Sequence, residues 1–353
     1  MSTPTLYAFI GTYTQTGSDG IYVCHVDSHI GAFTPASSAK TPNPTFLAIH
    51  PNKRFLYAVN ELEAGQDSVT AFAIEPSTGA LTELNRQLTI GGAPCHVTVD
   101  ATGRYVIVAD YGNGDICVFP VRADGSLGAA TQHIQQDRSA LDTTRQDSPH
   151  GHSVTLDAAN RFAFACDLGL DRVFIYHLDL ERGQLLSHGE AKLAPGAGPR
   201  HFAFHPSGKF AYAINELNNT MTAFAYDAVR GALREIQTLT TLPAGYTETS
   251  YCADVHVHPS GKFLYGSNRG HNSLVIFAID AATGQLSLIG HQSTGGDWPR
   301  NFALHPSANT LYVANQNSDS IVQFDLNLAT GELKPTGYTF NVPKPVCIKF
   351  LSL

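Results

Sequence analysis

One hairpin pattern recurs along the chain about every 50 residues, a spacing typical of repeat folds. In the copy from Gly198 to Leu217, apolar residues alternate on both sides of the turn His-Pro-Ser-Gly, as in half-buried antiparallel strands. Further copies begin at residues 44, 94, 149, 252 and 299. A third alternating segment follows each hairpin, and a weaker fourth segment comes after it. Four antiparallel strands per repeat predict the blades of a β-propeller.

These six copies leave one blade incomplete, and the two ends of the chain supply its parts. The segment from Pro345 to Phe350 matches a first strand only, whereas the other three strands match segments near the N-terminus. Pairing the C-terminal strand with the N-terminal strands closes the ring and removes free sheet edges. We therefore expect an all-β, seven-bladed β-propeller with four antiparallel strands per blade, formed by residues 1–353 as a single domain.

Composition narrows the classes of partner. The net charge is −8 and the isoelectric point is near 6.0, and no basic run is present, which argues against nucleic acid and membrane surfaces as partners. No apolar run is long enough to cross a membrane, and the N-terminus lacks the pattern of a signal peptide. The six cysteines show no Cys-x-x-Cys pair and favour buried thiols in a reducing compartment. We expect a cytoplasmic protein that is a monomer or a weak homo-oligomer.

Residues shared by most copies are interpreted as scaffold. A histidine precedes the turn proline at His50, His205, His258 and His305, and an Asn or Asp ends the second strand in each of the six complete copies. Short polar side chains at such positions form hydrogen bonds with the turning backbone. The function is therefore expected to lie in residues that differ between copies.

Such residues gather where the first strands begin and the second strands end. Because the two strands are antiparallel, both positions face the same mouth of the propeller channel. The first-strand candidates are His96, His150, His152, Arg200, His201, Asp254 and Arg300, and the second-strand candidates include Glu61, Glu216 and Arg269. Two long connections, residues 131–148 and 242–251, are expected to overhang this mouth, and the first contains Arg145. This convergence predicts a small-molecule site.

Several candidates also have structural interpretations. Arg200 and Glu216 enter and leave one hairpin, and they would form a structural ion pair as readily as a functional one. His201 alternates away from Arg200 and is expected to pack between blades. Glu61 lies in a longer loop and is expected to be solvated.

A metal site is a further alternative at one strand. His150 and His152 are two residues apart and are expected to point to the same side, where a third ligand would complete a metal site. No carboxylate or histidine stands at a recognisable ligand spacing from them. We therefore expect no metal.

The motifs taken together resemble the seven-bladed propeller lactonase family, over essentially the whole chain. The resemblance is carried by Gly11-Thr-Tyr-Thr, Asn60-Glu61, Pro94-Cys-His96-Val, Arg145-Gln146, Pro149-His-Gly-His152-Ser, Asp167-Leu-Gly-Leu-Asp171, Gly198-Pro-Arg200-His201, Asn215-Glu216-Leu, Asn268-Arg269-Gly, Pro299-Arg300 and Pro345-Val-Cys347. This family includes propeller-type 6-phosphogluconolactonases, and the fungal carboxymuconate lactonising enzyme is a relative. The resemblance implies hydrolysis of 6-phosphoglucono-1,5-lactone to 6-phosphogluconate in the pentose phosphate pathway, without a metal or other cofactor.

The resemblance also implies residue roles. Catalytic roles fall by motif on His152, Glu216, Arg200 and Arg269. Binding of the anionic sugar lactone is assigned, from position at the mouth and not from the resemblance, to His150, His96, Arg300, Arg145 and Asp254. We expect His152 to activate water, Glu216 to orient it or share the proton transfer, and the arginines to stabilise the oxyanion or the phosphate.

Two other functions remain compatible with these residues. A cycloisomerase acting on a carboxylated muconate would use the same His, Glu and Arg set. A non-catalytic propeller that binds other proteins is the second alternative, although the convergent residues argue against it. No Gly-x-Ser-x-Gly motif supports a serine hydrolase triad.

Overall fold

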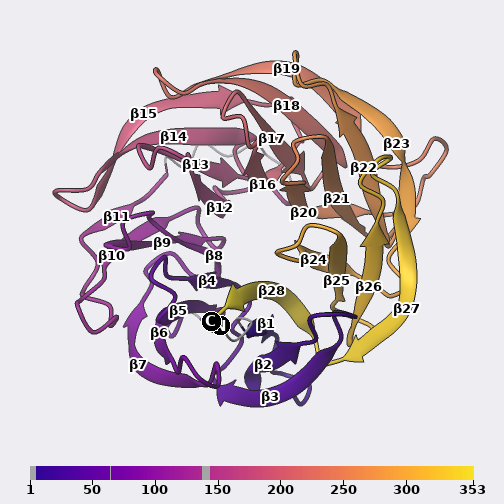
Figure 1. Cartoon of the computed structure of the whole chain (residues 1–353). Helices are drawn as coiled ribbons and strands as arrows, with labels where there is room; N and C mark the ends of the chain where they lie inside the picture. The colour runs from indigo at the N-terminus through magenta and orange to yellow at the C-terminus, as the bar shows by residue number, and fades with distance from the viewer. Residues whose placement is uncertain (1–4, 64, 137–143) are drawn as a thin grey trace.

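The computed structural model describes residues 5–63, 65–136 and 144–353, and its strands form seven four-stranded antiparallel sheets arranged in a ring (Figure 1). Blades 1 to 4 are, in order, β28 (Pro345–Ser352), β1 (Leu6–Thr12), β2 (Gly20–Val26) and β3 (Phe33–Lys40); β4 (Leu47–Ile49), β5 (Phe55–Asn60), β6 (Ser68–Ile74) and β7 (Leu81–Leu88); β8 (Pro94–Val99), β9 (Tyr105–Asp110), β10 (Ile116–Pro120) and β11 (Gln132–Ile134); and β12 (Gly151–Leu156), β13 (Phe162–Asp167), β14 (Arg172–Asp179) and β15 (Gln184–Lys192). Blades 5 to 7 are β16 (Pro199–Phe204), β17 (Phe210–Asn215), β18 (Thr220–Asp227) and β19 (Ala232–Thr240); β20 (Tyr251–Val257), β21 (Phe263–Arg269), β22 (Ser273–Ile279) and β23 (Leu286–Ser293); and β24 (Pro299–Leu304), β25 (Thr310–Asn315), β26 (Ser320–Leu326) and β27 (Leu333–Asn341). The prediction of seven four-stranded blades is confirmed.

The two ends of the chain complete blade 1 together. Strand β28 pairs antiparallel with β1, so that Leu6 lies opposite Ser352 and Ile10 lies opposite Ile348. In Figure 1 the yellow β28 lies beside the indigo β1. The predicted closure of the ring is therefore confirmed, and it places β28 among the inner strands.

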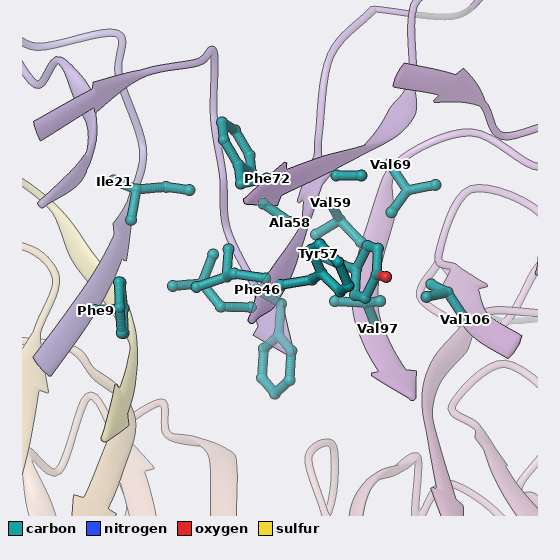
Figure 2. Close-up of a cluster of buried hydrophobic side chains, with 14 of the residues drawn as sticks. Phe9, Ile21, Phe46, Tyr57, Ala58, Val59, Val69, Phe72, Val97 and Val106 are labelled. Carbon is teal, nitrogen blue, oxygen red and sulfur yellow. The ribbon is translucent and has the colours of Figure 1, made fainter. Parts of the chain in front are cut away.

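Apolar side chains from neighbouring blades form the core. Figure 2 shows one cluster in which Tyr57 of β5 lies near Val97 and Val106 of the next blade, while Phe72 of β6 lies on the other face, toward Ile21 of the preceding blade. Tyr57 is fully buried, and its hydroxyl donates a hydrogen bond to the Gly125 carbonyl of that blade. Tyr212, Tyr265 and Tyr312 occupy the same strand position and also bond to a glycine carbonyl of the next blade. Tyr7 and Tyr105 stand two residues earlier in their strands and bond to the carbonyl oxygens of Ser77 and Leu180. Six of the seven blades are thus joined to the next by burial and by a satisfied second-strand hydroxyl, whereas β13 of blade 4 has Phe162 and Phe164 and contributes burial alone.

The repeated histidines before proline also join neighbouring blades. His50 Nε2 lies 2.9 Å from the Gly103 carbonyl oxygen, and His205 Nε2 lies 2.9 Å from that of Gly261. The other ring nitrogen of each faces its own turn. These contacts agree with the scaffold interpretation of the His-Pro motif and extend it to the blade interfaces.

Two further findings concern expectations that were drawn from the composition. Within the described part of the chain, no helix has the length and hydropathy needed to cross a membrane. All six cysteines are buried and unbridged, as expected from their spacing.

Candidate active site

A cavity of about 320 Å³ lies where the first strands begin and the second strands end. Its lining residues are Tyr13, Glu61, Cys95, Tyr111, Arg145, His152, Glu216, Tyr251, Arg269, Trp298 and Arg300. The structure thus brings together His152, Glu216 and Arg269 of the expected catalytic set, with Arg145 and Arg300 of the expected binding set. Arg200, His150, His96 and Asp254 do not line this cavity.

A β-bulge in the first strand aims four side chains toward the channel. In β8, β12, β16 and β24 the register shifts by one residue, which leaves Cys95, His152, Arg200 and Arg300 without a partner on the second strand. A bulge breaks the alternation of a strand and redirects the extra side chain. The same local irregularity therefore supplies one inward side chain from each of four blades.

Glu216 is the common partner of three arginines. Its Oε1 accepts a hydrogen bond from Arg145 Nη2 at 2.7 Å, and its Oε2 lies 3.0 Å from Arg200 Nε and 2.7 Å from Arg269 Nη2. Burial alone would raise the pKa of Glu216, but the charges of Arg269 and Arg200 and the Arg145 hydrogen bond lower it to about 2. The carboxylate therefore stays ionised and holds the guanidinium groups in place.

Arg200 lies beneath the cavity rather than in its wall. Its side chain is 2% exposed, and besides Glu216 it donates to the carbonyl oxygen of Ala253 at 2.6 Å. A second contact joins its Nη1 to His201 Nε2 at 3.1 Å. These contacts favour a role in fixing Glu216, in place of the direct contact with substrate that the sequence suggested.

Aromatic rings fix the planes of the three arginines that line the cavity. The guanidinium carbon lies 5.5 Å from the ring centroid of Tyr251 for Arg145, and 5.5 Å from that of Trp298 for Arg269. Arg300 lies 5.6 Å from the ring of Tyr13. Such cation–π contacts restrict the side chains. The N–H edge of Arg269 is partly engaged, since its Nε and Nη2 donate to the carbonyl oxygens of Tyr251 and Cys252 as well as to Glu216.

Arg300 differs from the other arginines of the site in its polar contacts. Among residues 5–63, 65–136 and 144–353, no carboxylate lies within ion-pair distance of its guanidinium group, and no hydrogen bond from it is found. Although burial opposes the charge, the nearby Tyr13 and Glu61 raise its pKa. Its N–H groups are therefore charged, oriented and unengaged.

His152 is buried and uncharged. Its Nδ1 atom lies 3.6 Å from Cys95 Sγ, and its ring meets Tyr111 edge-on at a centroid distance of 5.5 Å. Burial, together with the charges of Arg200 and Arg300, lowers the pKa of His152 well below its ordinary value. Within the described residues no hydrogen bond joins His152 to Glu216, so the expected orientation of the imidazole by this carboxylate is not observed.

His150 and His152 do not point to one side. His150 precedes β12 and stacks on Tyr111 at 4.4 Å, with its Nδ1 2.7 Å from the Tyr111 carbonyl oxygen. The expectation from alternation was wrong because the bulge at His152 redirects that side chain. In the described segments, no group of three or more His, Cys, Asp or Glu side chains is arranged to hold a metal ion.

The remaining candidates lie deeper in the channel. His201 is buried between inner strands, and its Nδ1 lies 2.8 Å from Asp254 Oδ1 of the next blade. The expectation that His201 points away from Arg200 was wrong, because the bulge places both on the channel side. Asp254 also accepts a hydrogen bond from Asn301, and the His96 ring packs 4.3 Å from that of Phe46. These side chains support the site from below.

One candidate was misjudged at the sequence level, and lining residues such as Cys95 were missed. Glu61 was placed at the mouth but was expected to be solvated, whereas it lines the cavity and accepts a 2.8 Å hydrogen bond from the Tyr13 hydroxyl. Its position directly after the second strand was the available signal. Cys95 had such a signal too, since it occupies the strand position of Arg200 and Arg300 in their blades.

The two long connections are described in part. Residues 137–143 of the segment 131–148 lie outside the described residues, whereas Arg145 is described and lines the cavity. Tyr251, at the end of the segment 242–251, lines it as well. Both connections thus contribute to the site as expected.

Comparisons with known proteins agree with the propeller architecture and identify the family. Residues 7–350 match the family model described as lactonase, 7-bladed beta-propeller. The chain is 38% identical to a 6-phosphogluconolactonase of Bacillus subtilis over 97% of both chains, and 36% identical to one of Formosa agariphila over 84% of this chain and 85% of that one. The solved structure of the periplasmic gluconolactonase of Pseudomonas aeruginosa has a TM-score of 0.93 and 35% identity, covering 98% of this chain and 99% of that one. The protein belongs to the seven-bladed β-propeller lactonase family.

Proposed function

We propose that the cavity hydrolyses a phosphorylated sugar lactone, 6-phosphoglucono-1,5-lactone, to 6-phosphogluconate, with His152 as base and Arg300 as oxyanion stabiliser. The observation that carries this proposal is the unengaged guanidinium of Arg300, whose charge acts on the neutral imidazole of His152. The names of the two 6-phosphogluconolactonase relatives support the same substrate. Membership of an enzyme family argues against the non-catalytic platform.

The charge of the site supports an anionic substrate. Four guanidinium groups (Arg145, Arg200, Arg269 and Arg300) and two carboxylates (Glu61 and Glu216) line the cavity or bind a lining residue directly, so their formal charges sum to +2 while His152 is neutral. The whole chain carries −8. A sugar phosphate carries close to two negative charges at neutral pH. The site therefore concentrates positive charge where such an anion would bind.

The reaction requires two proton transfers. Nε2 of neutral His152 takes a proton from a water molecule as the water oxygen attacks the lactone carbonyl carbon. The resulting oxyanion is stabilised by Arg300, which stays protonated and cannot itself act as a base. As the bond between the carbonyl carbon and the ring oxygen breaks, the imidazolium returns its proton to that oxygen. The product is an open-chain aldonic acid, which ionises in water.

The phosphate is assigned to the outer part of the cavity. Arg145 is 41% exposed, so it lies at the mouth, and Arg269 lies beside it on the same carboxylate. Guanidinium groups bind phosphate with paired, charge-assisted hydrogen bonds. Arg145 and Arg269 are thus proposed to hold the phosphate while the lactone ring reaches His152.

Steady-state kinetics on phosphorylated and unphosphorylated gluconolactone test these assignments. His152→Ala and Arg300→Ala should lower kcat about a hundredfold on both lactones, as for loss of a general base or an oxyanion donor. Arg145→Ala should raise KM for the phosphorylated lactone about tenfold or more and change KM for the neutral one less than about twofold. Arg172→Ala, an exposed arginine on β14 that does not line the cavity, serves as the matched control.

Three outcomes would overturn the proposal. Wild-type kcat in His152→Ala or Arg300→Ala would reject the catalytic roles. An equal effect of Arg145→Ala on both lactones would reject the phosphate site. Turnover of a carboxymuconate lactone by the wild-type protein, without turnover of either gluconolactone, would instead favour the cycloisomerase alternative. The expected cytoplasmic location remains a prediction, since one relative is named periplasmic.

A further inference from the structure

We propose that Cys95 is a positioning residue that selects the tautomer of His152, keeping the proton on Nδ1 and leaving the Nε2 lone pair to act as the base. The inference rests on the proposed role of His152 and deepens it. Cys95 and His152 are the bulged residues of two neighbouring inner strands, β8 and β12. Both line the cavity, and Cys95 Sγ lies 3.6 Å from His152 Nδ1.

Hydrogen-bond counting favours this tautomer. The thiol of Cys95 has backbone acceptors at the carbonyl oxygens of Gly151 and His152, each 3.5 Å away, and at that of Ala109, 3.8 Å away. With the proton on Nδ1, the imidazole donates to sulfur while the thiol donates to a carbonyl, which makes two bonds. With the proton on Nε2, the thiol must donate to Nδ1 and its carbonyl bond is lost. Although sulfur is a weak acceptor, it is the one side-chain partner of Nδ1 in the described residues, beside a hydrogen bond between the ring and the backbone of His152 itself.

The environment of Cys95 suits this role and not that of a nucleophile. The residue is 7% exposed, and burial, together with the charge of Glu61, raises the pKa of its thiol. A neutral thiol is a poor nucleophile but retains both its donor and its acceptor capacity. The other described cysteines do not line the cavity. Cys95 is therefore the one described cysteine whose sulfur lies against a side chain of the cavity wall.

Nitrogen-15 NMR of the histidine rings tests the tautomer directly in the wild-type protein. At neutral pH, His152 should show a protonated Nδ1 and an unprotonated Nε2, with its signals assigned by their absence in His152→Ala. A wild-type His152 that carries its proton on Nε2 would overturn the inference. This reading does not depend on the folding of any Cys95 variant.

Kinetics on the variants provide the second test. Cys95→Ala should populate the other tautomer and lower kcat about fivefold, with KM changed less than twofold, because a weak bond to sulfur selects the reactive form. Cys95→Ser, whose hydroxyl can both donate and accept, should recover most of this loss. Cys24→Ala removes a buried thiol of the blade 1 core and should leave kcat unchanged.

Different results would reject the role of Cys95 and the proposed function of His152. Unchanged kcat and an unchanged His152 tautomer in folded Cys95→Ala would overturn the role of Cys95 alone. Full activity in His152→Ala would overturn the proposed function, whatever tautomer the wild-type ring adopts.

Discussion

The Nε atom of Arg200 lies 3.0 Å from Oε2 of Glu216, and the two residues stand at the two ends of one hairpin, β16–β17. The same carboxylate binds Arg145 and Arg269, which come from a connection before β12 and from the end of β21. Three distant segments thus meet at one buried anion. Glu216 organises the positive charge of the cavity, and Arg200 anchors Glu216 from below.

Glu216→Gln should destabilise the fold and impair the site together. The substitution leaves Arg200 buried without its counter-charge, so the free energy of unfolding should fall by about 3 kcal/mol. Urea titration measures this change. Glu190→Gln, which removes an exposed ion pair with Arg172, should change stability by less than about 0.5 kcal/mol. Equal stability of the two variants would contradict an anchoring role for Glu216.

Activity should be insensitive to pH around neutrality. Since burial and the charges of Arg200, His201 and Arg300 lower the pKa of His152 well below its ordinary value, the imidazole stays neutral at neutral and mildly acidic pH. For the unphosphorylated lactone, which has no phosphate that titrates near pH 6, the ratio kcat/KM should be flat between about pH 6 and pH 8. It should fall only on further acidification, as His152 gains a proton. Initial rates corrected for uncatalysed lactone hydrolysis check this. A half-maximal rate near pH 6.5 would show that His152 is not depressed, or is not the base.

Trp298→Gly should lower activity while changing the stability of the fold only slightly. Trp298 has a φ of 65°, and the equivalent residue of blade 5, Gly198, has a φ of 62°. A bulky residue in this region is strained by about 1–2 kcal/mol, which glycine avoids. The free energy gained by removing this backbone strain should offset much of the free energy lost with the packing of the indole ring. The free energy of unfolding should therefore change by less than about 1 kcal/mol.

Activity of the same variant should fall, because Arg269 loses the ring on which it stacks. We expect KM for the phosphorylated lactone to rise about tenfold, a loss typical of a disturbed charged contact. Trp298→Phe keeps an aromatic face and should retain most of the affinity. Urea titration measures the stability of each variant, and steady-state kinetics measure KM. Unchanged kinetics in Trp298→Gly would reject this role of Trp298.

Asp110→Asn should stabilise the protein increasingly as pH rises. The equivalent position holds Asn in other blades, where Asn268 and Asn315 donate to the backbone carbonyls of Thr241 and Thr294. An ionised Asp cannot donate, and burial raises the pKa of Asp110 to about 8. Between about pH 4 and pH 8 the unfolded chain has lost this proton while the folded protein keeps it, so wild-type stability falls as pH rises.

Asparagine has no such proton to lose. The stability gain of Asp110→Asn over the wild type should therefore be larger at pH 8 than at pH 5, by about 1 kcal/mol or more. Urea midpoints at the two pH values measure it. A gain that is the same at both pH values would show that Asp110 is ionised throughout.

Much of the fold was predictable from local pattern. Alternating apolar residues, turn residues and a spacing of about 50 residues recur in every blade, and each copy confirms the others. The pairing of β28 with β1 also followed, because a ring with six complete copies and two partial ends closes in one way. The His-Pro motif was correctly interpreted as scaffold, since a feature common to most blades serves what the blades have in common.

The sequence alone determined the ring, the mouth at which function gathers, and five of the residues that line the cavity: Arg145, His152, Glu216, Arg269 and Arg300. Only the tertiary structure decided their directions and partners. One-residue bulges reverse the alternation on which sequence reasoning relies, and so His150 turns away from His152 while Arg200 and His201 face the same channel. The contacts of Glu216, Cys95 and Arg300 join blades far apart in the chain, and no local pattern records which side chain meets which across a ring.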